Sequence, residues 1–182
     1  MEVYVGFGAN LGRRLASISR ALFQVDALPG TRIKAVSPIY ETAPVGYLEQ
    51  GDFLNGVCCL ETAMEPVALL QALLRIEKTL GRVRTVHWGP RTIDLDLLFF
   101  AGLIIRRPEL RLPHPRLAAR GFVLYPLYDL APGLRHPELG VTVAALLTAW
   151  RRAAGAAEPP VQRTGYRLGL PRAGRSGNTG NN

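Results

Sequence analysis

The sequence is poor in cysteine and contains no long apolar run. Its two cysteines, Cys58 and Cys59, are adjacent, so they would alternate across a strand, could not easily form a disulfide and lack metal-ligand spacing. No apolar run approaches the roughly 20 residues of a transmembrane helix. The opening residues, MEVYVGFGAN, lack the basic segment of a signal peptide and are typical of a strand. These features predict a protein without membrane segments in a reducing, cytoplasmic compartment.

Glycine-rich phosphate loops are also missing from the sequence. Gly6, Gly8 and Gly12 fit neither the GxxxxGK[ST] loop of nucleotide-binding proteins nor the GxGxxG spacing of dinucleotide-binding folds. A turn lined by glycines is the better interpretation of this segment. Any phosphate group would therefore have to be bound by charged side chains and a metal ion.

The net charge of +8 is distributed unevenly. Six Arg and one Glu lie from residue 151 onward, a net charge of +5 that leaves +3 for residues 1–150. Because the last segment is rich in Gly, Pro, Arg and Asn, we predict one domain over 1–150 and a disordered basic tail over 151–182 that is dispensable for activity. A mildly basic body suits a small polyanion such as ATP at least as well as a nucleic acid duplex.

Apolar periodicity gives the order strand, helix, strand, strand, helix, strand. Neighbouring strands in this order favour an antiparallel α+β sheet with the helices on one face. The predicted strands cover residues 2–9, 31–41 with a break at Pro38, 52–62 and 93–100. The predicted helices cover residues 13–28, 65–80, a segment ending at 130, and 142–150.

Two acidic residues interrupt the apolar strand predicted at 93–100. Asp94 and Asp96 are two residues apart, so a strand places both carboxylates on one face, where they repel each other unless a cation or a shared proton intervenes. Mg²⁺ suits such a pair, held by one or two carboxylates together with substrate phosphates. Upstream, Arg82, Arg84 and Arg91 are candidates for bidentate phosphate contacts. The alternative is an edge strand with two solvated acids.

Asn55 and Trp88 each have two interpretations. Asn55 lies in an apolar strand and either satisfies a neighbouring backbone group or reads the edge of a heterocycle. Trp88 lies in a loop and either covers the edge of the core or closes over a bound ring. Phe53 and Phe122 are core residues by default.

Glu77 and His114 are the remaining titratable candidates. Glu77 is either a solvated acid on the second helix or a residue of the same cleft as Arg82. His114 lies between two prolines and is the histidine in the most suggestive setting. His136 is predicted to lie at the surface.

Taken together, these segments resemble a known family. Seven blocks occur in order over most of residues 1–140: VGFGANLG, SPIYETAPVG, FLNGVCCLET, RIEKTLGRVR, HWGPRTIDLDLL, LPHPRLAARGF and VLYPLYDLAP. In sequence and spacing they resemble the 6-hydroxymethyl-7,8-dihydropterin pyrophosphokinases of folate biosynthesis. The resemblance implies a ferredoxin-like α+β fold with a βαββαβ core. It also implies transfer of the β,γ-diphosphoryl unit of ATP to the pterin hydroxymethyl oxygen, with release of AMP.

The resemblance also implies roles for individual residues. Asp94 and Asp96 would hold two Mg²⁺ ions, and Arg82 and Arg91 would act with them in catalysis. The implied ATP-binding residues are Glu77, Arg82, Arg84, Arg91, His114 and Arg120. The implied pterin-binding residues are Thr42, Pro44, Val45, Phe53, Asn55, Trp88 and Phe122, with Asn55 at the pterin edge, Phe122 on one face and Trp88 in a lid. The expected partners are ATP and a pterin alcohol, bound by a monomer, without nucleic acid or membrane.

Several positions depart from the family pattern. Leu74 stands where many members have Gln near the nucleotide, and Pro115 stands where an aromatic residue is common. Ala43 replaces a frequent proline, Phe53 replaces a frequent tyrosine, and the loop before Trp88 is one residue short. The first two differences concern adenine contacts, and the last concerns the lid.

Two alternatives remain open at this point. A ferredoxin-like nucleic-acid-binding module would explain the aromatic residues and the basic tail, but the acidic pair would repel its phosphates. A kinase that releases ADP and a pterin monophosphate would use the same metal site. The acidic pair separates the module from the enzymes, and the nucleotide product separates the two enzymes.

Overall fold

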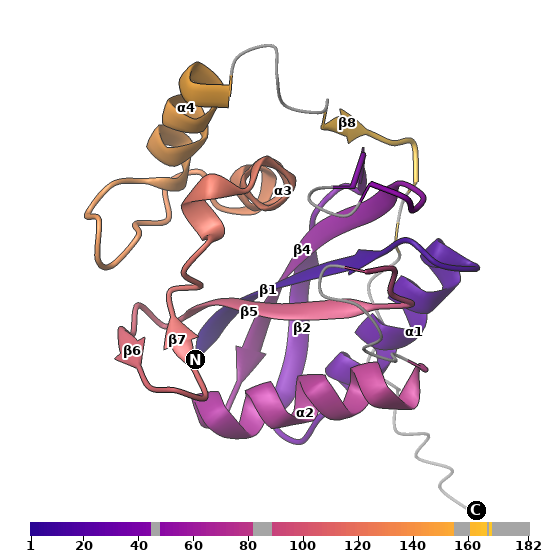
Figure 1. Cartoon of the computed structure of the whole chain (residues 1–182). Helices are drawn as coiled ribbons and strands as arrows, with labels where there is room; N and C mark the ends of the chain where they lie inside the picture. The colour runs from indigo at the N-terminus through magenta and orange to yellow at the C-terminus, as the bar shows by residue number, and fades with distance from the viewer. Residues whose placement is uncertain (45–47, 82–88, 155–160, 167, 169–182) are drawn as a thin grey trace, which may run out of the picture.

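The computed structural model describes residues 1–44, 48–81, 89–154, 161–166 and 168 (Figure 1). Within these residues, one sheet contains six strands: β1 (Glu2–Ala9), β2 (Thr31–Val36), β3 (Tyr40–Thr42), β4 (Phe53–Thr62), β5 (Asp94–Phe100) and β8 (Gln162–Arg163). A separate ribbon consists of β6 (Ile105–Arg106) and β7 (Arg111–Leu112). The helical segments are α1 (Arg14–Asp26), α2 (Pro66–Thr79), the short 3-10 turn η1 (Leu117–Ala119), α3 (Gly121–Leu130) and α4 (Val143–Ala154).

β1 lies inside the sheet and pairs antiparallel with β4 on one edge and β5 on the other. All its residues from Val3 to Ala9 are buried, the pattern of a strand covered on both faces. β2 and β3 both pair with the far edge of β4, β2 along its C-terminal half and β3 along its N-terminal half. The predicted break at Pro38 is confirmed, because it separates β2 from β3.

Helices cover both faces of the sheet (Figure 1). On one face α1 and α2 pack with side chains such as Leu22 and Leu73 against Val5 of β1. On the other face α3 packs with side chains such as Leu124 against the cluster that contains Leu98 of β5, and α4 packs against α3. The prediction of helices on a single face is therefore confirmed for α1 and α2, the two helices of the predicted strand–helix order, and wrong for α3 and α4. The physical reason is that β1, β4 and β5 are apolar nearly throughout rather than alternating, so both of their faces need a cover.

The ends of α1 and α2 follow from local backbone chemistry. Gly12, with a φ of 59°, makes the turn before α1, and Pro66 occupies the first turn of α2, where its missing N–H leaves no donor unpaired. Leu69, Leu73 and Ile76 form the buried stripe of α2. Burying a side chain of this size stabilises a fold by about 2 kcal/mol.

Part of the segment predicted to be a disordered tail is ordered. α4 continues to Ala154, and the Arg151 guanidinium stacks 4.8 Å above the ring centre of Tyr125 in α3. Beyond it, β8 pairs antiparallel with β3. The prediction is wrong for residues 151–154 and 161–166, because backbone pairing needs no apolar pattern in the sequence. Residues 169–182 lie outside the described part.

Among the described residues, no helix combines the length and the apolar character needed to cross a bilayer.

Candidate functional site

On the face of the sheet that α3 covers, paired residues of the adjacent strands β5, β1 and β4 lie side by side. Gly8 of β1 pairs with Asp94 of β5 on one side and with Asn55 of β4 on the other. One step along, Gly6 of β1 pairs with Asp96. Because glycine carries no side chain, the space between the two acids and the amide stays open; a Cβ at Gly8 would lie 2.7 Å from Asn55 Oδ1.

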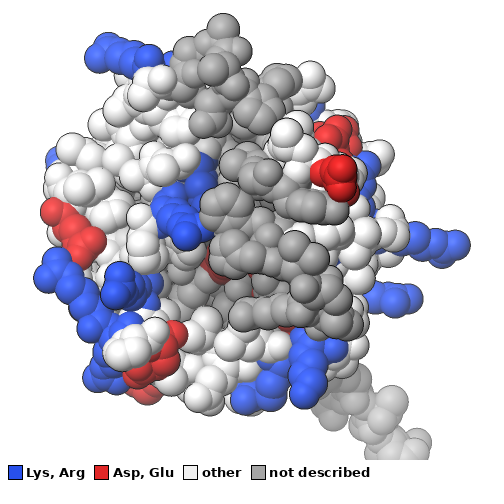
Figure 2. All heavy atoms as spheres, viewed as in Figure 1, with Lys and Arg blue, Asp and Glu red and all other residues white. Residues whose placement is uncertain are grey.

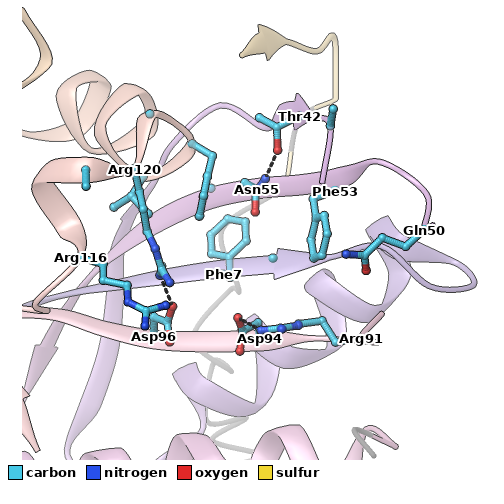
Figure 3. A pocket seen from close by; sticks show the side chains of 18 residues that line it. Phe7, Thr42, Gln50, Phe53, Asn55, Arg91, Asp94, Asp96, Arg116 and Arg120 are labelled. Carbon is cyan, nitrogen blue, oxygen red and sulfur yellow. Dashed lines mark hydrogen bonds and ion pairs between the residues drawn. The ribbon is translucent and has the colours of Figure 1, made fainter. Parts of the chain in front are cut away.

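A cavity of about 310 Å³ opens above these glycines (Figure 3), close to the lower end of the range of about 300–1,000 Å³ for small-molecule sites. The strands provide its floor. Its walls come from the loop between β3 and β4 and from the segment that leads through η1 into α3. Lining residues from these walls are Thr42, Ala43, Gln50, Phe53, Arg116, Ala119, Arg120, Gly121, Phe122 and Val123.

One end of the cavity is charged. Asp94 and Asp96 both face it, as their spacing predicts (Figure 3). Arg91 Nη1 donates to Asp94 Oδ2 over 2.6 Å, and Arg120 Nη1 donates to Asp96 Oδ2 over 3.3 Å. Arg116 lines the same end. The two acids are therefore neither bare nor fully solvated: the Asp94 and Arg91 side chains are only 21% and 19% exposed.

The opposite end of the cavity is neutral and partly aromatic. Asn55 is buried, and its Nδ2 donates to Thr42 Oγ1 over 2.7 Å, a bond between two side chains. Phe53 and Phe122 line the cavity as half-buried residues instead of filling the core. The Arg120 guanidinium lies 5.5 Å from the centre of the Phe122 ring, which joins the neutral end to the charged end.

Asn10, which the sequence analysis missed, connects the segments on two sides of the cavity. Its Oδ1 accepts the Arg91 N–H over 2.8 Å, and its Nδ2 donates to Gln50 Oε1 over 2.8 Å and to the Gly51 carbonyl over 3.1 Å. The side chain is buried, so these bonds are shielded from water. Asn10 thereby holds the Arg91 segment and the β3–β4 loop at a fixed separation.

Glu77 and His114 lie behind the residues that line the cavity. Glu77 is 2% exposed and accepts the N–H of Leu95, between the two acids, over 2.7 Å, which excludes the solvated-acid interpretation. His114 Nδ1 accepts the Arg116 N–H over 3.1 Å. Burial lowers the pKa of His114, which keeps the imidazole neutral and able to accept this bond near pH 7. Both side chains therefore orient segments that carry lining residues.

The remaining candidates are distributed as follows. Pro44 is buried next to the lining residue Ala43. Val45, Arg82, Arg84 and Trp88 lie outside the described residues. In the part of the chain that the structure describes, no group of three or more His, Cys, Asp or Glu side chains is placed to hold a metal ion on its own.

Arg116, Gln50 and the paired glycines are lining residues that the sequence analysis did not identify. The sequence contained a signal for Gly6 and Gly8. Glycines at alternate positions inside an apolar strand mark a place where a ligand or another part of the chain approaches the strand closely. Their interpretation as part of a turn is wrong, because both lie within β1; only Gly12 lies in the turn.

Comparison with known proteins identifies the family. The model of the 7,8-dihydro-6-hydroxymethylpterin-pyrophosphokinase family matches residues 4–132. A 2-amino-4-hydroxy-6-hydroxymethyldihydropteridine pyrophosphokinase of Pseudomonas aeruginosa is 49% identical over 137 residues, which cover 75% of this chain and 85% of the relative. The folic acid synthesis protein fol1 of Schizosaccharomyces pombe is 44% identical over 134 residues, 74% of this chain but 18% of that protein.

Solved structures agree on the fold. A crystal structure of HPPK-DHPS in complex with substrates superposes with a TM-score of 0.67 at 15% sequence identity, covering 84% of this chain and 43% of that chain. The chain thus spans less than half of that solved protein and about a fifth of the fungal relative. The match over residues 4–132 includes β1, β4 and β5, the strands that form the cavity floor. The chain belongs to the 7,8-dihydro-6-hydroxymethylpterin-pyrophosphokinase family.

Proposed function

We propose that this chain transfers the diphosphoryl unit of ATP to 6-hydroxymethyl-7,8-dihydropterin, giving the pterin diphosphate and AMP in folate biosynthesis. The observation that carries the proposal is the division of one cavity into a charged end and a neutral, aromatic end. A triphosphate suits the first end and a flat heterocycle suits the second. The names of the relatives supply the identity of the two substrates.

The charged end fits magnesium. Asp94 and Asp96 offer hard oxygen ligands on one face of β5, and two carboxylates leave coordination positions for phosphate oxygens and water, as Mg²⁺ prefers. We therefore assign these two side chains as the residues that would hold two Mg²⁺ ions. Bound there, the ions would neutralise phosphate charge and polarise the oxygens of the triphosphate.

The arginines would exchange partners when ATP binds. Arg91 and Arg120 now pair with the two carboxylates, and Arg116 lies beside them. Phosphate oxygens would take over these guanidinium groups while the carboxylates turn to the metal. The arginines would then stabilise negative charge on the diphosphoryl unit and on the departing AMP.

The neutral end would position the acceptor. Asn55 and Thr42 would bind the polar edge of the pterin, with Phe53 and Phe122 against its ring. The hydroxymethyl oxygen would then lose its proton to water and form a bond to the β-phosphorus, while the bond from that phosphorus to the oxygen bridging the α-phosphate would break and release AMP. Positioning and charge neutralisation account for most of the catalysis of such a transfer.

The product decides between this proposal and a kinase that transfers one phosphate. The protein should be incubated with ATP, Mg²⁺ and the pterin alcohol, and the nucleotide product identified by chromatography. AMP in equal amounts with a pterin diphosphate is the expected result. ADP with a pterin monophosphate would overturn the proposed diphosphoryl transfer but would leave the proposed metal site in place.

Asp94→Asn and Asp96→Asn should each lower kcat by at least about 100-fold, because metal and phosphate charge stabilisation is worth several kcal/mol.

The rival nucleic-acid-binding module has no support among the relatives. Figure 2 shows the described Lys and Arg side chains scattered over the visible face instead of following one stripe.

The strand order β5-β1-β4-β2 supports our proposal that the core of the fold is the ferredoxin-like arrangement of βαββαβ. We propose that the protein acts as a monomer, since one chain provides both ends of the cavity. Mass measurement in solution with and without ATP would test this state.

A further inference from the structure

β3 is a short strand with a large influence on the neutral end of the cavity. Its three residues pair with β4, so that Thr42 lies opposite Phe53 and Tyr40 lies opposite Asn55. Thr42 also accepts the hydrogen bond from Asn55 Nδ2. Any shift of β3 therefore moves Thr42 and changes the orientation of Asn55.

The outer edge of β3 is covered by the C-terminal segment that we call the C-terminal strap, residues 161–166 together with Leu168. Within it, β8 pairs with Tyr40 and Glu41. The next residue, Thr164, donates twice to the Ile39 carbonyl, from its backbone N–H over 2.8 Å and from its hydroxyl over 2.9 Å. Leu168 packs against the core on the α1 side of the sheet.

The Thr164 hydroxyl also closes the strap on itself. While it donates to Ile39, it accepts the N–H of Tyr166 over 3.2 Å. One side chain thus fixes both the contact to the residue before β3 and the bend that leads toward Leu168. A three-residue edge strand has few bonds of its own, so a second strand on its open edge lowers its tendency to fray.

We propose that the C-terminal strap is a positioning device for the pterin: it fixes β3 and thereby the Thr42–Asn55 pair. The inference rests on the proposed function for the identity of the ligand. It concerns a segment outside residues 4–132, the region that the family model matches. Every charged side chain that the structure describes at this end lies on β5 or on the segments from 89 to 120, so the strap should affect the pterin and leave ATP binding unchanged.

The test uses single substitutions in the full chain. Thr164→Pro removes the donated N–H and the hydroxyl, Thr164→Ala removes only the hydroxyl, and Thr164→Ser restores it. Thr148→Ala is the matched control, because the Thr148 hydroxyl bonds within the exposed face of α4. KM for the pterin, KM for ATP, kcat and the melting temperature should be measured for each variant.

We expect Thr164→Ala to raise the pterin KM about three- to tenfold, the range that one or two lost hydrogen bonds represent. Thr164→Pro should raise it further, Thr164→Ser should restore it, and the ATP KM should stay within twofold throughout. Equal increases in both KM values, or a pterin KM that does not change in Thr164→Pro, would overturn the proposal.

Amide hydrogen exchange provides a readout that is independent of catalysis. In the Thr164 variants the segment containing β3 should exchange faster, while the segment containing β5 should keep its protection. If the full chain forms no pterin diphosphate, the proposed function fails but the exchange result still decides whether the strap holds β3. Unchanged exchange at β3 would overturn the strap's role even in an active enzyme.

Discussion

Gly8 lies between Asp94 and Asn55 in the row of paired residues that crosses the cavity floor. A Cβ at this position would lie 2.7 Å from Asn55 Oδ1, closer than two such atoms can approach. The Asn55 side-chain amide would have to rotate away from Thr42 or move into the cavity. This one glycine therefore sets the orientation of a residue on the neighbouring strand.

Gly8→Ala should raise the pterin KM at least about tenfold, because one misplaced hydrogen-bonding group is worth roughly 1.4 kcal/mol or more in binding. The ATP KM should change little, since Gly8 does not separate Asp94 from Arg91. Titration of each ligand by calorimetry would measure both affinities. Gly133→Ala, at a position where a Cβ meets no atom within 4 Å, is the control. A Gly8→Ala protein with wild-type pterin affinity would show that the floor tolerates a side chain.

At the residue scale, spacing in the sequence was informative for side chains on strands. Asp94 and Asp96 share one face because side chains alternate along a regular strand, and Asn55 is buried because β4 is covered on both faces. Arg116 and Asn10 gave no signal, since residues in irregular segments have no period from which a direction can be inferred. The resemblance to a family named Arg120 and Phe122, both of which line the cavity.

At the scale of elements, the packing of α3 against α4 depends on a glycine and a tryptophan. A Cβ at Gly121 would lie 2.4 Å from the Trp150 indole ring. The same ring meets Tyr125 edge-on, with ring centres 6.0 Å apart. Because Gly121 lines the cavity and precedes Phe122, this contact connects the outer helix to the site.

Gly121→Ala should lower the free energy of unfolding by about 1–3 kcal/mol, because a methyl group forced into a packed contact displaces a rigid ring. The penalty should shrink in a Trp150→Leu background, where the ring is gone. Urea unfolding of the wild type, both single variants and the double variant gives the coupling energy directly. Additive effects of the two substitutions would mean that the ring is not what Gly121 accommodates.

The boundaries of α1, α2, β1, β4 and β5 were predicted within about two residues, and the strand–helix order of this core was correct, but α4 extends four residues beyond its predicted end and β6, β7 and β8 were not predicted. Regular apolar spacing accounts for this success in α1 and α2, which each bury one stripe. The placement of α3 and α4 and the structure of residues 151–154 and 161–166 were predicted wrongly. Both depend on contacts between distant segments: α3 covers the second face of the sheet, and β8 joins β3 through backbone groups that every residue carries.

At the scale of the whole molecule, His136 connects stability to pH. It was predicted at the surface, but it is 6% exposed, and its ring meets Phe99 edge-on with ring centres 5.6 Å apart. Its Nδ1 accepts the Leu139 N–H over 3.3 Å, which requires a neutral ring at that nitrogen. Burial lowers the pKa of His136 below the ordinary value of 6.5.

The free energy of unfolding should therefore decrease as the pH falls below about 6.5. The unfolded chain binds a proton at His136 first, and the folded protein follows only at the lower, folded-state pKa. The contribution of His136 to the free energy of unfolding is complete above pH 6.5. Below that pH, the free energy of unfolding can decrease by at most about 1.36 kcal/mol per pH unit for one titrating group. Urea unfolding at pH 7.5 and 5.5 would measure it.

His136→Gln should reduce this pH dependence, although His114 contributes in the same direction because burial also lowers its pKa. The comparison should stop above pH 5, where carboxylates begin to titrate. Parallel curves for the wild type and His136→Gln would exclude His136 as a source of the pH dependence.

The position of β1 in the sheet has a consequence for synthesis on the ribosome. Val3 pairs with Leu60 on one side and with Phe100 on the other, so β1 is made before both of its neighbours and gains the second only with β5. Until residue 100 has left the exit tunnel, this apolar strand keeps an open edge. Contacts between such distant parts of a chain slow folding and prolong the exposure of aggregation-prone apolar surface. The nascent protein should therefore depend on chaperones that bind its N-terminal segment, and slowing translation should not relieve that dependence before β5 emerges.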